Sequence, residues 1–498
     1  MLRPDEIKEL IDDDKASTRK TRAAVGQRYY EGQHDILQYR MFYFNADGEL
    51  VEDTTRSNMR IPHPFFTELA DQLAPYMLSF EENPIRAKLG ADNAADALQE
   101  QLDSYFGDDF WSEISDLITG AYVKGFEYLY GYKGENDRLA FQCADSLGVV
   151  EVREKDSSDG RAYVIYWYVE HVGKSDVTRI QVHSPDMIEY YVLDKKSGRV
   201  YLDESQPLNP RPNVVYRDQR GQLYGRGLGF IPFWRLDNCK QQASGLEPIK
   251  GIIDDYDLMK CGLSNNLQDF DHPLYVVRGF DGDNLDELMV NLRTKKGIGT
   301  PDSSGGVDIQ TINIPIEARK ANLEEDEKNI YRFGMGFNSS QVGDGNITNV
   351  VIRSRYTLLD LKAKKLEKQL KKLLQKIIPV VLNEINAIEG TDYSPEDVEL
   401  KFERNVPTNE QENVQNDYTR AQTKQLEVNT ILNAAAQIGD EATLNALCAV
   451  LDLDPEEIKA QLDDAAQATP EAAQATLEQV VTTDEQEAEA SPTVPAEE

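Results

Sequence analysis

The sequence SSQVGDGNITNVVIRSRYTLLDLKAKKLEKQLKK, residues 339–372, joins a polar loop with two glycines to a long basic helix. After the loop, apolar residues recur alternately four and three positions apart, which is the repeat of a helix that packs along a seam. The repeat consists of Leu359, Ala363, Leu366, Leu370, Leu373, Ile377 and Val380. We therefore predict a helix from about residue 350 to Ile388. Pro379 predicts a kink near its end, because proline removes a backbone hydrogen bond.

This helix concentrates positive charge in an acidic chain. The 498 residues have a net charge of −35, which argues against general affinity for nucleic acid because phosphates are repelled. Between 353 and 376, nine basic residues are opposed only by Asp360 and Glu367, a local net charge of +7. Two interpretations stay open. The lysines form the solvated face of a packed helix, or they bind phosphate or an acidic neighbouring subunit.

The rest of the sequence indicates an α+β protein that is long enough for more than one hydrophobic core. Between about 127 and 235, short β-forming runs alternate with turn signals, which favours an antiparallel β-domain. A β-α-β pattern at 273–314 lies between two predicted helices at 245–270 and 316–333. Further predicted elements are helices within 1–40, a hairpin within 41–61 that turns at 46–49, a helix at 63–80, helices from 93 to 126 and helices within 408–465. From Asp463 onward there are ten acidic residues and no lysine or arginine, which predicts a disordered tail.

No pattern of catalytic or metal-binding chemistry is present in the sequence. The phosphate-binding pattern GxxxxGK[ST] is absent, and the five histidines lack ligand spacing. The four cysteines form no CxxC pair, which favours a reducing compartment without disulfides. The longest apolar runs are too short to cross a bilayer. The sequence thus predicts no catalytic residue, no metal, no cofactor and no membrane partner, in a soluble protein of the cell interior.

Several segments, in this order and spacing, resemble the portal proteins of tailed double-stranded DNA bacteriophages, in the long-tailed phage branch of the head-to-tail connector family. The matching segments are RYYEGQHDI (28–36), YFNADGELVEDTTRSNMRIPHPFFTELADQLAPYML (43–78), IPF (231–233), IKGIIDDYDLMKCGLSNNLQDFDHPLYVVRGFDG (249–282), NLR…SGGVDIQTINIPIEA (291–318) and TLLDLKAKKLE (357–367). Each is a loose pattern by itself, and together they span about residues 30–410.

The resemblance implies a portal fold with an α/β wing, a two-helix stem, a small β-α-β clip, a long kinked tunnel helix and an α-helical crown. The implied boundaries are 1–244 for the N-terminal arm and wing, 245–269 for the first stem helix, 270–314 for the clip, 315–337 for the second stem helix, 338–349 for the tunnel loop, 350–407 for the tunnel helix and wing return, 408–465 for the crown and 466–498 for the acidic disordered tail.

The resemblance also implies a function and a set of partners. Twelve copies would form a ring at the unique capsid vertex of the virion, assembled in the host cytoplasm. The ring would be the channel for packaging and ejection of double-stranded DNA. It would be the docking site for the terminase large subunit and later for the head–tail adaptor, with scaffolding and major capsid proteins as further partners. No cofactor is implied, because the ATPase is a separate protein.

Three groups of residues follow as candidates. The first would line the narrowest part of the channel, where glycines let a loop move against DNA; it comprises Gln341, Val342, Gly343, Gly345, Asn346, Ile347, Thr348, Asn349 and Arg353. This loop keeps the small polar character of the family but not its residue order. Lys295 and Lys296 are candidates for partner contact in the clip. Leu359, Leu366, Leu370 and Leu373 are candidates for packing between subunits.

Two other classes of protein remain as alternatives. An acidic, coiled-coil-rich structural or scaffold protein would use the basic helix to bind acidic subunits and would never pass DNA. An enzyme is the third alternative, although no motif supports it.

Overall fold

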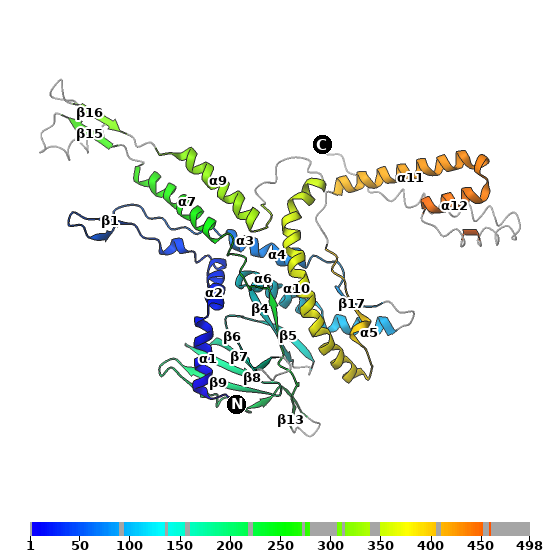
Figure 1. Ribbon diagram of the computed structural model, residues 1–498, viewed down its shortest axis with the longest axis horizontal. Helices are drawn as coiled ribbons and strands as arrows, with labels where there is room; N and C mark the ends of the chain where they lie inside the picture. Colours follow the sequence, from blue (N-terminus) through cyan, green and yellow to red (C-terminus); the bar gives the residue numbers. More distant parts are fainter. Residues whose placement is uncertain are drawn as a thin grey trace, which may run out of the picture. The chain divides into compact units, whose positions relative to one another are not determined.

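The structure is a computed structural model that describes residues 2–88, 94–134, 138–154, 160–217, 223–270, 274–278, 306–310, 314–338, 349–404, 410–451 and 458–459. The chain divides into two compact units (Figure 1). The first comprises Met1–Gly345 and Arg353–Val406, and the second comprises Asn346–Ile352 and Pro407–Glu498. The mixed α and β character predicted from the sequence is confirmed.

The first unit begins with helices α1 (Pro4–Ala16) and α2 (Thr18–Tyr30). Ser17 separates them, because its extended backbone ends α1 and its hydroxyl accepts the Lys20 N–H at the start of α2. Ile7 and Ile11 of α1 are buried with apolar residues of the large sheet. The buried Lys20 donates to the carbonyl oxygens of Ser146 and Val149, so α2 is also fixed to the β-domain.

The β-domain predicted at 127–235 is confirmed as antiparallel. Its largest sheet has the strand order β10-β9-β8-β7-β6, with β11 paired to β9, and a second sheet has the order β14-β4-β5. The strands are β4 (Phe126–Lys133), β5 (Leu139–Ala144), β6 (Val149–Arg153), β7 (Arg161–Val172), β8 (Ser175–His183), β9 (Met187–Asp194), β10 (Arg199–Leu202), β11 (Arg211–Pro212) and β14 (Phe233–Asp237), with β12 (Val214–Arg217) and β13 (Leu223–Arg226) as a separate pair.

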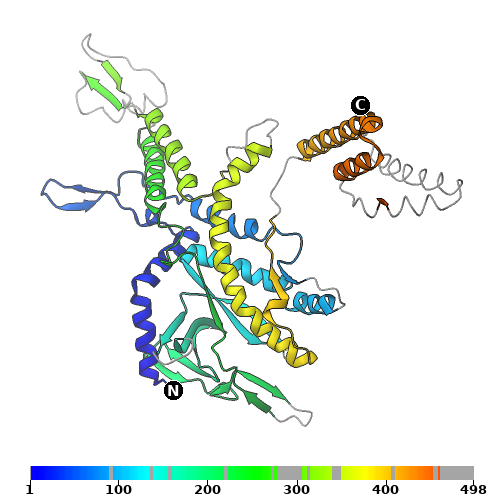
Figure 2. The ribbon, with the colours of Figure 1, turned by 45° about the vertical axis from the view of Figure 1, so that its right-hand side comes forward.

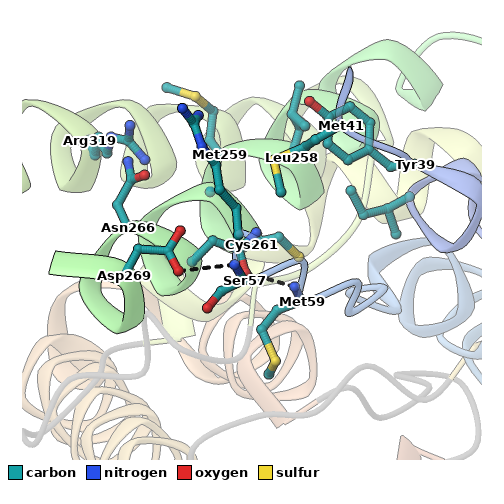
Figure 3. A pocket seen from close by; sticks show the side chains of 14 residues that line it. Tyr39, Met41, Ser57, Met59, Leu258, Met259, Cys261, Asn266, Asp269 and Arg319 are labelled. Atoms are coloured by element: carbon teal, nitrogen blue, oxygen red, sulfur yellow. Dashed lines mark hydrogen bonds between the residues drawn. The ribbon is translucent and has the colours of Figure 1, made fainter. Parts of the chain in front are cut away.

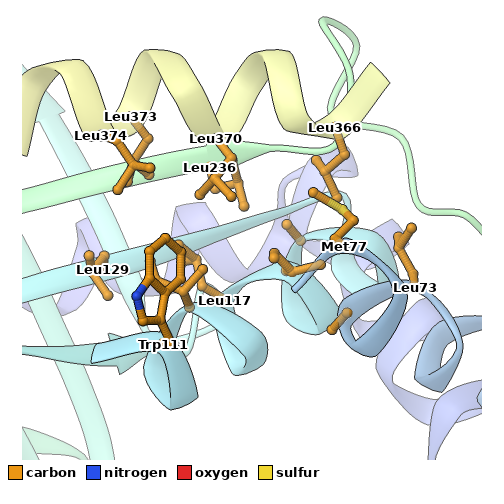
Figure 4. Close-up of a cluster of buried hydrophobic side chains, with 14 of the residues drawn as sticks. Leu73, Met77, Trp111, Leu117, Leu129, Leu236, Leu366, Leu370, Leu373 and Leu374 are labelled. Atoms are coloured by element: carbon orange, nitrogen blue, oxygen red, sulfur yellow. The ribbon is translucent and has the colours of Figure 1, made fainter. Parts of the chain in front are cut away.

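The main hydrophobic core lies where a long helix crosses the smaller sheet (Figure 4). This helix, α10 (Asn349–Glu389), confirms the helix predicted at 350–388. It continues through Pro379 without interruption, and Figure 2 shows that it bends along its course. The other core elements are α3 (Phe65–Asp71), α4 (Leu73–Met77), α5 (Ala94–Tyr105) and α6 (Asp108–Lys124), with β3 (Ile85–Ala87) paired to β17 (Val398–Leu400), which follows the short 3-10 helix η4 (Pro395–Asp397).

The single helix predicted at 63–80 is wrong in one respect, since the structure has two short helices there. Pro75 cannot donate to the carbonyl of Asp71, so the helix breaks at Gln72. The Gln72 side chain bonds the backbone N–H and carbonyl of Phe337, which fixes a distant segment at the break. The interruption thus provides an anchoring point for the chain before the 339–348 segment.

A helix pair extends beside this core (Figures 1 and 2). It consists of α7 (Lys250–Phe270) and α9 (Ile316–Phe333), which pack together along their length. Between them in the sequence are the paired strands β15 (Leu274–Arg278) and β16 (Gly306–Gln310). The helix predicted between these strands falls outside the described residues. α7 begins later than predicted, because residues 245–249 form a turn.

The predicted N-terminal hairpin is confirmed as β1 (Phe42–Phe44) and β2 (Leu50–Glu52). It follows a 3-10 helix, η1 (Asp35–Gln38). Its turn depends on Gly48, which has φ +78°, and on Asn45, whose Oδ1 accepts the N–H groups of Asp47 and Glu49.

The second unit contains α11 (Glu410–Ile438) and α12 (Asp440–Leu451), which pack against each other. Gly439 separates them with φ +84°, a conformation that favours glycine. Helices were predicted within 408–465, and these two confirm that part. The helix start predicted at Asp454 and the acidic tail lie outside the described residues.

Candidate channel helix and assembly surfaces

Most of the residues predicted to line a channel lie outside the described residues. These are Gln341, Val342, Gly343, Gly345, Asn346, Ile347 and Thr348, and the same holds for Lys295 and Lys296. Asn349 is the first residue of α10, and Arg353 lies one helical turn further on. These assignments therefore stay predictions. What the structure does describe is the helix that follows the loop and the surfaces around it.

The four leucines predicted to pack between subunits are buried inside this chain. Figure 4 shows Leu366, Leu370 and Leu373 of α10 directed toward Met77, Leu236 and Leu129. Leu359 belongs to the same core, and none of the four is more than 3% exposed. The prediction is corrected because the chain's own α4, α6 and small sheet cover the seam. The leucines thus hold α10 to its own subunit.

Lys362 also faces the core rather than the solvent. Its Nζ donates to the carbonyl oxygens of Gly334 at 3.1 Å and Leu69 at 3.4 Å, and it lies 4.2 Å from the centre of the Tyr122 ring. Burial lowers the pKa of this amine to about 7. Gly334 ends α9, so Lys362 connects the end of α9 to α3 and α10. The sequence contained a signal for this position, since residue 362 is three after Leu359 and four before Leu366.

Lys362→Met is expected to change how stability depends on pH. The folded chain holds this amine with a pKa near 7 and the unfolded chain holds it near 10.4, so the unfolded state binds more protons between these values. The free energy of unfolding of the unmodified chain therefore rises above pH 7, by up to about 1.4 kcal/mol per pH unit from this residue. Urea unfolding at pH 7, 8 and 9 measures the rise, which Lys362→Met should lose. The exposed Lys368→Met should keep it, and equal slopes in both variants would contradict a buried neutral amine.

Two acidic residues of α10, Asp360 and Glu367, form ion pairs with Arg404 in the segment that follows the helix. The Arg404 guanidinium bonds Asp360 at 2.8 Å and also Glu367. Asp360 pairs further with Lys364 at 2.7 Å, and Glu367 pairs with Lys371 at 2.8 Å. The pairs with Lys364 and Lys371 join residues four positions apart, which is the ordinary spacing of ion pairs on a helix surface. They neutralise two of the nine basic residues between 353 and 376.

The lysines that remain form one exposed stripe. Lys365, Lys368, Lys372 and Lys376 follow each other at three- and four-residue spacing, and within the described part of the chain none of them has an ion pair. Like charges four residues apart destabilise a helix by about 0.2–0.5 kcal/mol per pair. The stripe thus destabilises α10 slightly, and its charge is available to a partner.

An extended segment lies along α7 and bonds to it at regular intervals (Figure 3). Four alternate N–H groups of residues 57–63 donate to α7 side chains spaced four residues apart. The pairs are Ser57 with Asp269 Oδ1 (2.9 Å), Met59 with Asn265 Oδ1 (2.7 Å), Ile61 with Cys261 Sγ (3.3 Å) and His63 with Asp257 Oδ1 (2.9 Å). Two extended residues rise about 6.6 Å and four helical residues about 6 Å, so the two repeats match. We call this arrangement the α7 ladder.

The α7 ladder cannot be predicted from the apolar residues of this helix, but its polar residues contain a signal. Asp257, Cys261, Asn265 and Asp269 recur every four residues, which places them on one side of the helix. A polar stripe on a helix that is otherwise packed indicates a hydrogen-bonded neighbour, because buried backbone N–H groups require acceptors.

Asp257 also holds both ends of the segment that carries the hairpin. Its Oδ2 lies 2.7 Å from Nδ1 of the buried His34, and its Oδ1 lies 2.7 Å from Nδ1 of His63. Burial raises the pKa of the Asp257 carboxyl, but the hydrogen bonds with the two histidines outweigh it and hold that pKa below its ordinary value. His34 precedes the hairpin and His63 follows it. One carboxylate of α7 therefore anchors the hairpin segment at both ends.

Asp257→Asn is expected to destabilise the folded chain by about 1–3 kcal/mol, since an amide has one accepting oxygen where the carboxylate has two. The folded pKa of Asp257 is depressed, so its contribution is present at neutral pH and is lost as the pH falls below about 4 through the folded pKa. The free energy of unfolding of the variant should therefore be lower than that of the unmodified chain at pH 7, and the two values should approach each other in acid. Denaturant unfolding at pH 7 and pH 3 measures both effects, with the exposed Asp255→Asn as control. A constant difference at both pH values would contradict this account.

Among the described residues, no group of three or more histidine, cysteine, aspartate or glutamate side chains could hold a metal ion. In the same part of the chain, no helix is both long and apolar enough to cross a bilayer.

Comparisons with known proteins identify relatives of this chain. The family model "Phage portal protein, SPP1 Gp6-like" matches residues 9–471. The portal protein of Bacillus phage SPP1 is 26% identical over 396 residues, which cover 78% of this chain and 75% of the relative. The portal protein of Clostridium phage phiCD119 is 26% identical over 425 residues, which cover 82% and 87%. A chain from the neck of an empty GTA particle, computed with C6 symmetry, is similar in structure with a TM-score of 0.39 and 14% identity, covering 79% of this chain and 91% of that one.

Proposed function

Since the chain belongs to the phage portal protein family in its SPP1 Gp6-like branch, we propose that its copies form a closed ring whose bore is lined by the 341–349 loop and the start of α10. Portal proteins are ring-forming components of the phage virion, where they provide the DNA channel and a docking site for other head proteins. Membership supports that general role for this chain. Our proposal concerns which of its parts perform it.

The order of elements carries the proposal. Two packed helices, α7 and α9, enclose a strand pair in the sequence, and the long helix α10 follows after a short loop. We assign α7 and α9 to the stem (245–269 and 315–337), the segment between them to the clip (270–314) and residues 338–349 to the tunnel loop. Residues 1–244 are then the arm and wing, 350–407 the tunnel helix and wing return, 408–465 the crown and 466–498 an acidic tail.

DNA contact is assigned to a small number of residues. In this proposal Gln341, Val342, Asn346, Ile347, Thr348 and Asn349 border the bore, and Arg353 lies close behind them. Gly343 and Gly345 supply backbone freedom to the loop. A strongly acidic chain suits this role, because a channel that passes DNA must repel phosphates more than it binds them. The lysine stripe of α10 is assigned to protein contacts rather than to DNA.

Partner contacts are assigned to the two ends of the ring. Lys295 and Lys296 belong to the clip, which would meet the terminase large subunit during packaging and the head–tail adaptor afterwards. Scaffolding and major capsid proteins would surround the ring at the capsid vertex, with assembly in the host cytoplasm. The chain itself performs no catalysis in this proposal, since the packaging ATPase is a separate protein. Support for these assignments comes from family membership.

Negative-stain electron microscopy of the purified chain tests the proposal. Rings with a central hole, and twelve copies in the virion, are the expected result. Monomers or filaments under all conditions would instead favour an acidic scaffold protein that never passes DNA. Image classification also gives the ring symmetry, which the sequence does not supply.

A further inference from the structure

The β1–β2 hairpin is exposed on both faces. All six of its strand residues are exposed, and Phe44, at 73%, is the most exposed large hydrophobic side chain among the described residues. In the same hairpin Leu50 is 60% exposed and Phe42 is 53% exposed. A two-stranded hairpin is marginally stable by itself in water. Apolar exposure of this kind in a soluble chain marks an interaction surface.

The hairpin is nevertheless firmly attached at its base. The α7 ladder holds residues 57–63 along the helix, and Asp257 bonds both His34 and His63. Chain on both sides of the hairpin is therefore fixed to α7, while the hairpin itself projects beyond it (Figures 1 and 2). Such an anchored arm presents its side chains in a defined position, which reduces the entropy that a partner would have to remove on binding.

The strand register separates two faces of the hairpin. Phe42 pairs with Glu52 and Phe44 pairs with Leu50, so these four side chains share one face. Tyr43 and Val51 lie on the other. Residues 42–52 include Asp47, Glu49 and Glu52 and no lysine or arginine. A surface that receives this hairpin must therefore be apolar at its centre and positively charged at its rim.

A groove of that description lies at the base of the arm (Figure 3). Its volume is about 280 Å³, below the range of about 300–1,000 Å³ usual for small-molecule sites and suited to one or two side chains. The apolar lining includes Tyr39, Met41, Met59, Leu258 and Met259. Arg319 and Arg56 supply positive charge, and Arg56 also pairs with Asp53 at 3.3 Å. The one acidic residue of the lining, Asp269, already accepts the Ser57 N–H.

The hairpin of a chain is directed away from its own groove. Tyr39 and Met41 line the groove and lead directly into β1, which carries Phe44 away at about 3.3 Å per residue. Each copy thus offers one arm and one groove that are complementary in apolar character and in charge. A head-to-tail contact of this kind closes into a ring when repeated around an axis.

We propose that Phe44 and Leu50 of one copy occupy the groove of the adjacent copy, with Asp47 and Glu49 beside Arg56 and Arg319. The occupant is a second copy of this chain. This contact rests on the ring of the proposed function and identifies one surface that joins its members. It also explains why the α7 ladder is built so firmly, because a loose arm would lose affinity to conformational entropy.

Disulfide trapping tests the contact directly. Leu50→Cys and Leu258→Cys place one thiol on the hairpin and one in the groove, and both parent leucines are exposed. Under mild oxidation the double variant is expected to give a ladder of covalent oligomers on a non-reducing gel. A mixture of the two single variants should give covalent dimers only, which proves that the bond joins different copies. Leu258→Cys alone should give no ladder. A ladder from Leu50→Cys alone would place the hairpin thiol beside the native Cys261 of the groove and would support the same contact.

Phe44→Asp supplies a second readout. Anchor residues of this kind contribute about 2 kcal/mol or more, so the concentration needed for ring formation should rise at least about tenfold. The melting temperature of the dissociated chain should stay unchanged, because the Phe44 side chain is largely exposed and makes few contacts within its own chain. Tyr201→Asp, at an aromatic position on β10 that is 49% exposed, is the control and should assemble normally.

The outcomes separate this contact from the proposed function. Rings in the unmodified chain that persist in Phe44→Asp, without cross-links in the double variant, overturn the contact alone. An unmodified chain that forms no ring overturns the proposed function and the contact with it. Protection of Leu50→Cys from alkylation only after addition of another head protein would assign the hairpin to that partner and reject our proposal.

Discussion

Leu370→Asp is expected to prevent folding of the first unit. Leu370 is 0% exposed and lies in the core between α10 and the small sheet (Figure 4). The change removes a buried leucine, at a cost of about 2–5 kcal/mol, and adds a carboxylate that has no buried partner. That total is comparable to the whole stability of a typical domain, about 5–15 kcal/mol. Circular dichroism and denaturant unfolding of the purified variant measure the loss.

Leu361→Asp is the matched control on the same helix. Leu361 is 52% exposed, and surface substitutions usually change stability by less than about 0.5 kcal/mol. The pair also decides between the two roles considered for the leucine repeat. If the repeat packed between subunits, Leu370→Asp would give a folded chain that fails only to form rings. Observation of that result would contradict the core shown in the structure.

Deletion of Val342–Thr348 is expected to leave rings intact and to abolish DNA packaging. The deletion removes the residues proposed to border the bore, while the α10 core and the exposed hairpin are unchanged. Rings are counted by negative-stain microscopy, and packaged DNA is measured as nuclease-resistant DNA in heads assembled with the variant. The deleted loop can no longer contact DNA in the channel, so heads should remain empty.

A glycine–serine loop of equal length separates two explanations for that loss. It keeps the distance between Gln341 and Asn349 but removes the side chains. If the side chains contact DNA, this variant should also package poorly. If only the length of the connection matters, it should package normally. Full packaging by the deletion itself would remove the loop from the proposed mechanism.

The leucine repeat of α10 shows what periodicity can and cannot predict. Its four–three spacing predicted α10 to within one residue at each end. It could not predict what covers the seam, because a heptad states that one side of a helix is apolar and does not identify the partner. The leucines therefore appeared suitable for packing between subunits. In the structure they are covered by residues that are distant in the sequence, such as Met77 of α4 and Leu236 of β14.

Charge was harder to interpret than hydrophobic pattern. Nine basic residues on α10 looked equivalent in the sequence, yet Lys362 is buried against two carbonyls and Lys364 and Lys371 are paired. The partners of these lysines include Arg404-linked acids and the end of α9, which only the folded chain brings together. Residue 362 was the one case that helical spacing from Leu359 could have separated in advance.

The candidate channel itself depends on the family resemblance more than on local physics. Residues 341–348 have the composition of an ordinary polar loop, and glycines alone do not distinguish a DNA-contacting loop from a simple connection. The groove at the base of the hairpin, in contrast, is revealed by the folded chain alone. Its apolar residues come from several separate segments between Ile36 and Arg319, so no window of sequence could reveal it.

The α7 ladder has a limited length that follows from the residues at its two ends. Toward the start of α7 the next position is Ile253, whose side chain has no acceptor. At the other end the Thr55 N–H donates to Asp53 Oδ1 instead of to α7. The outermost acceptors of the ladder are the carboxylates of Asp257 and Asp269, and a charged acceptor binds an N–H group more strongly than a neutral one. The strand is thereby locked in one register, so any axial displacement of α7 must carry the hairpin with it.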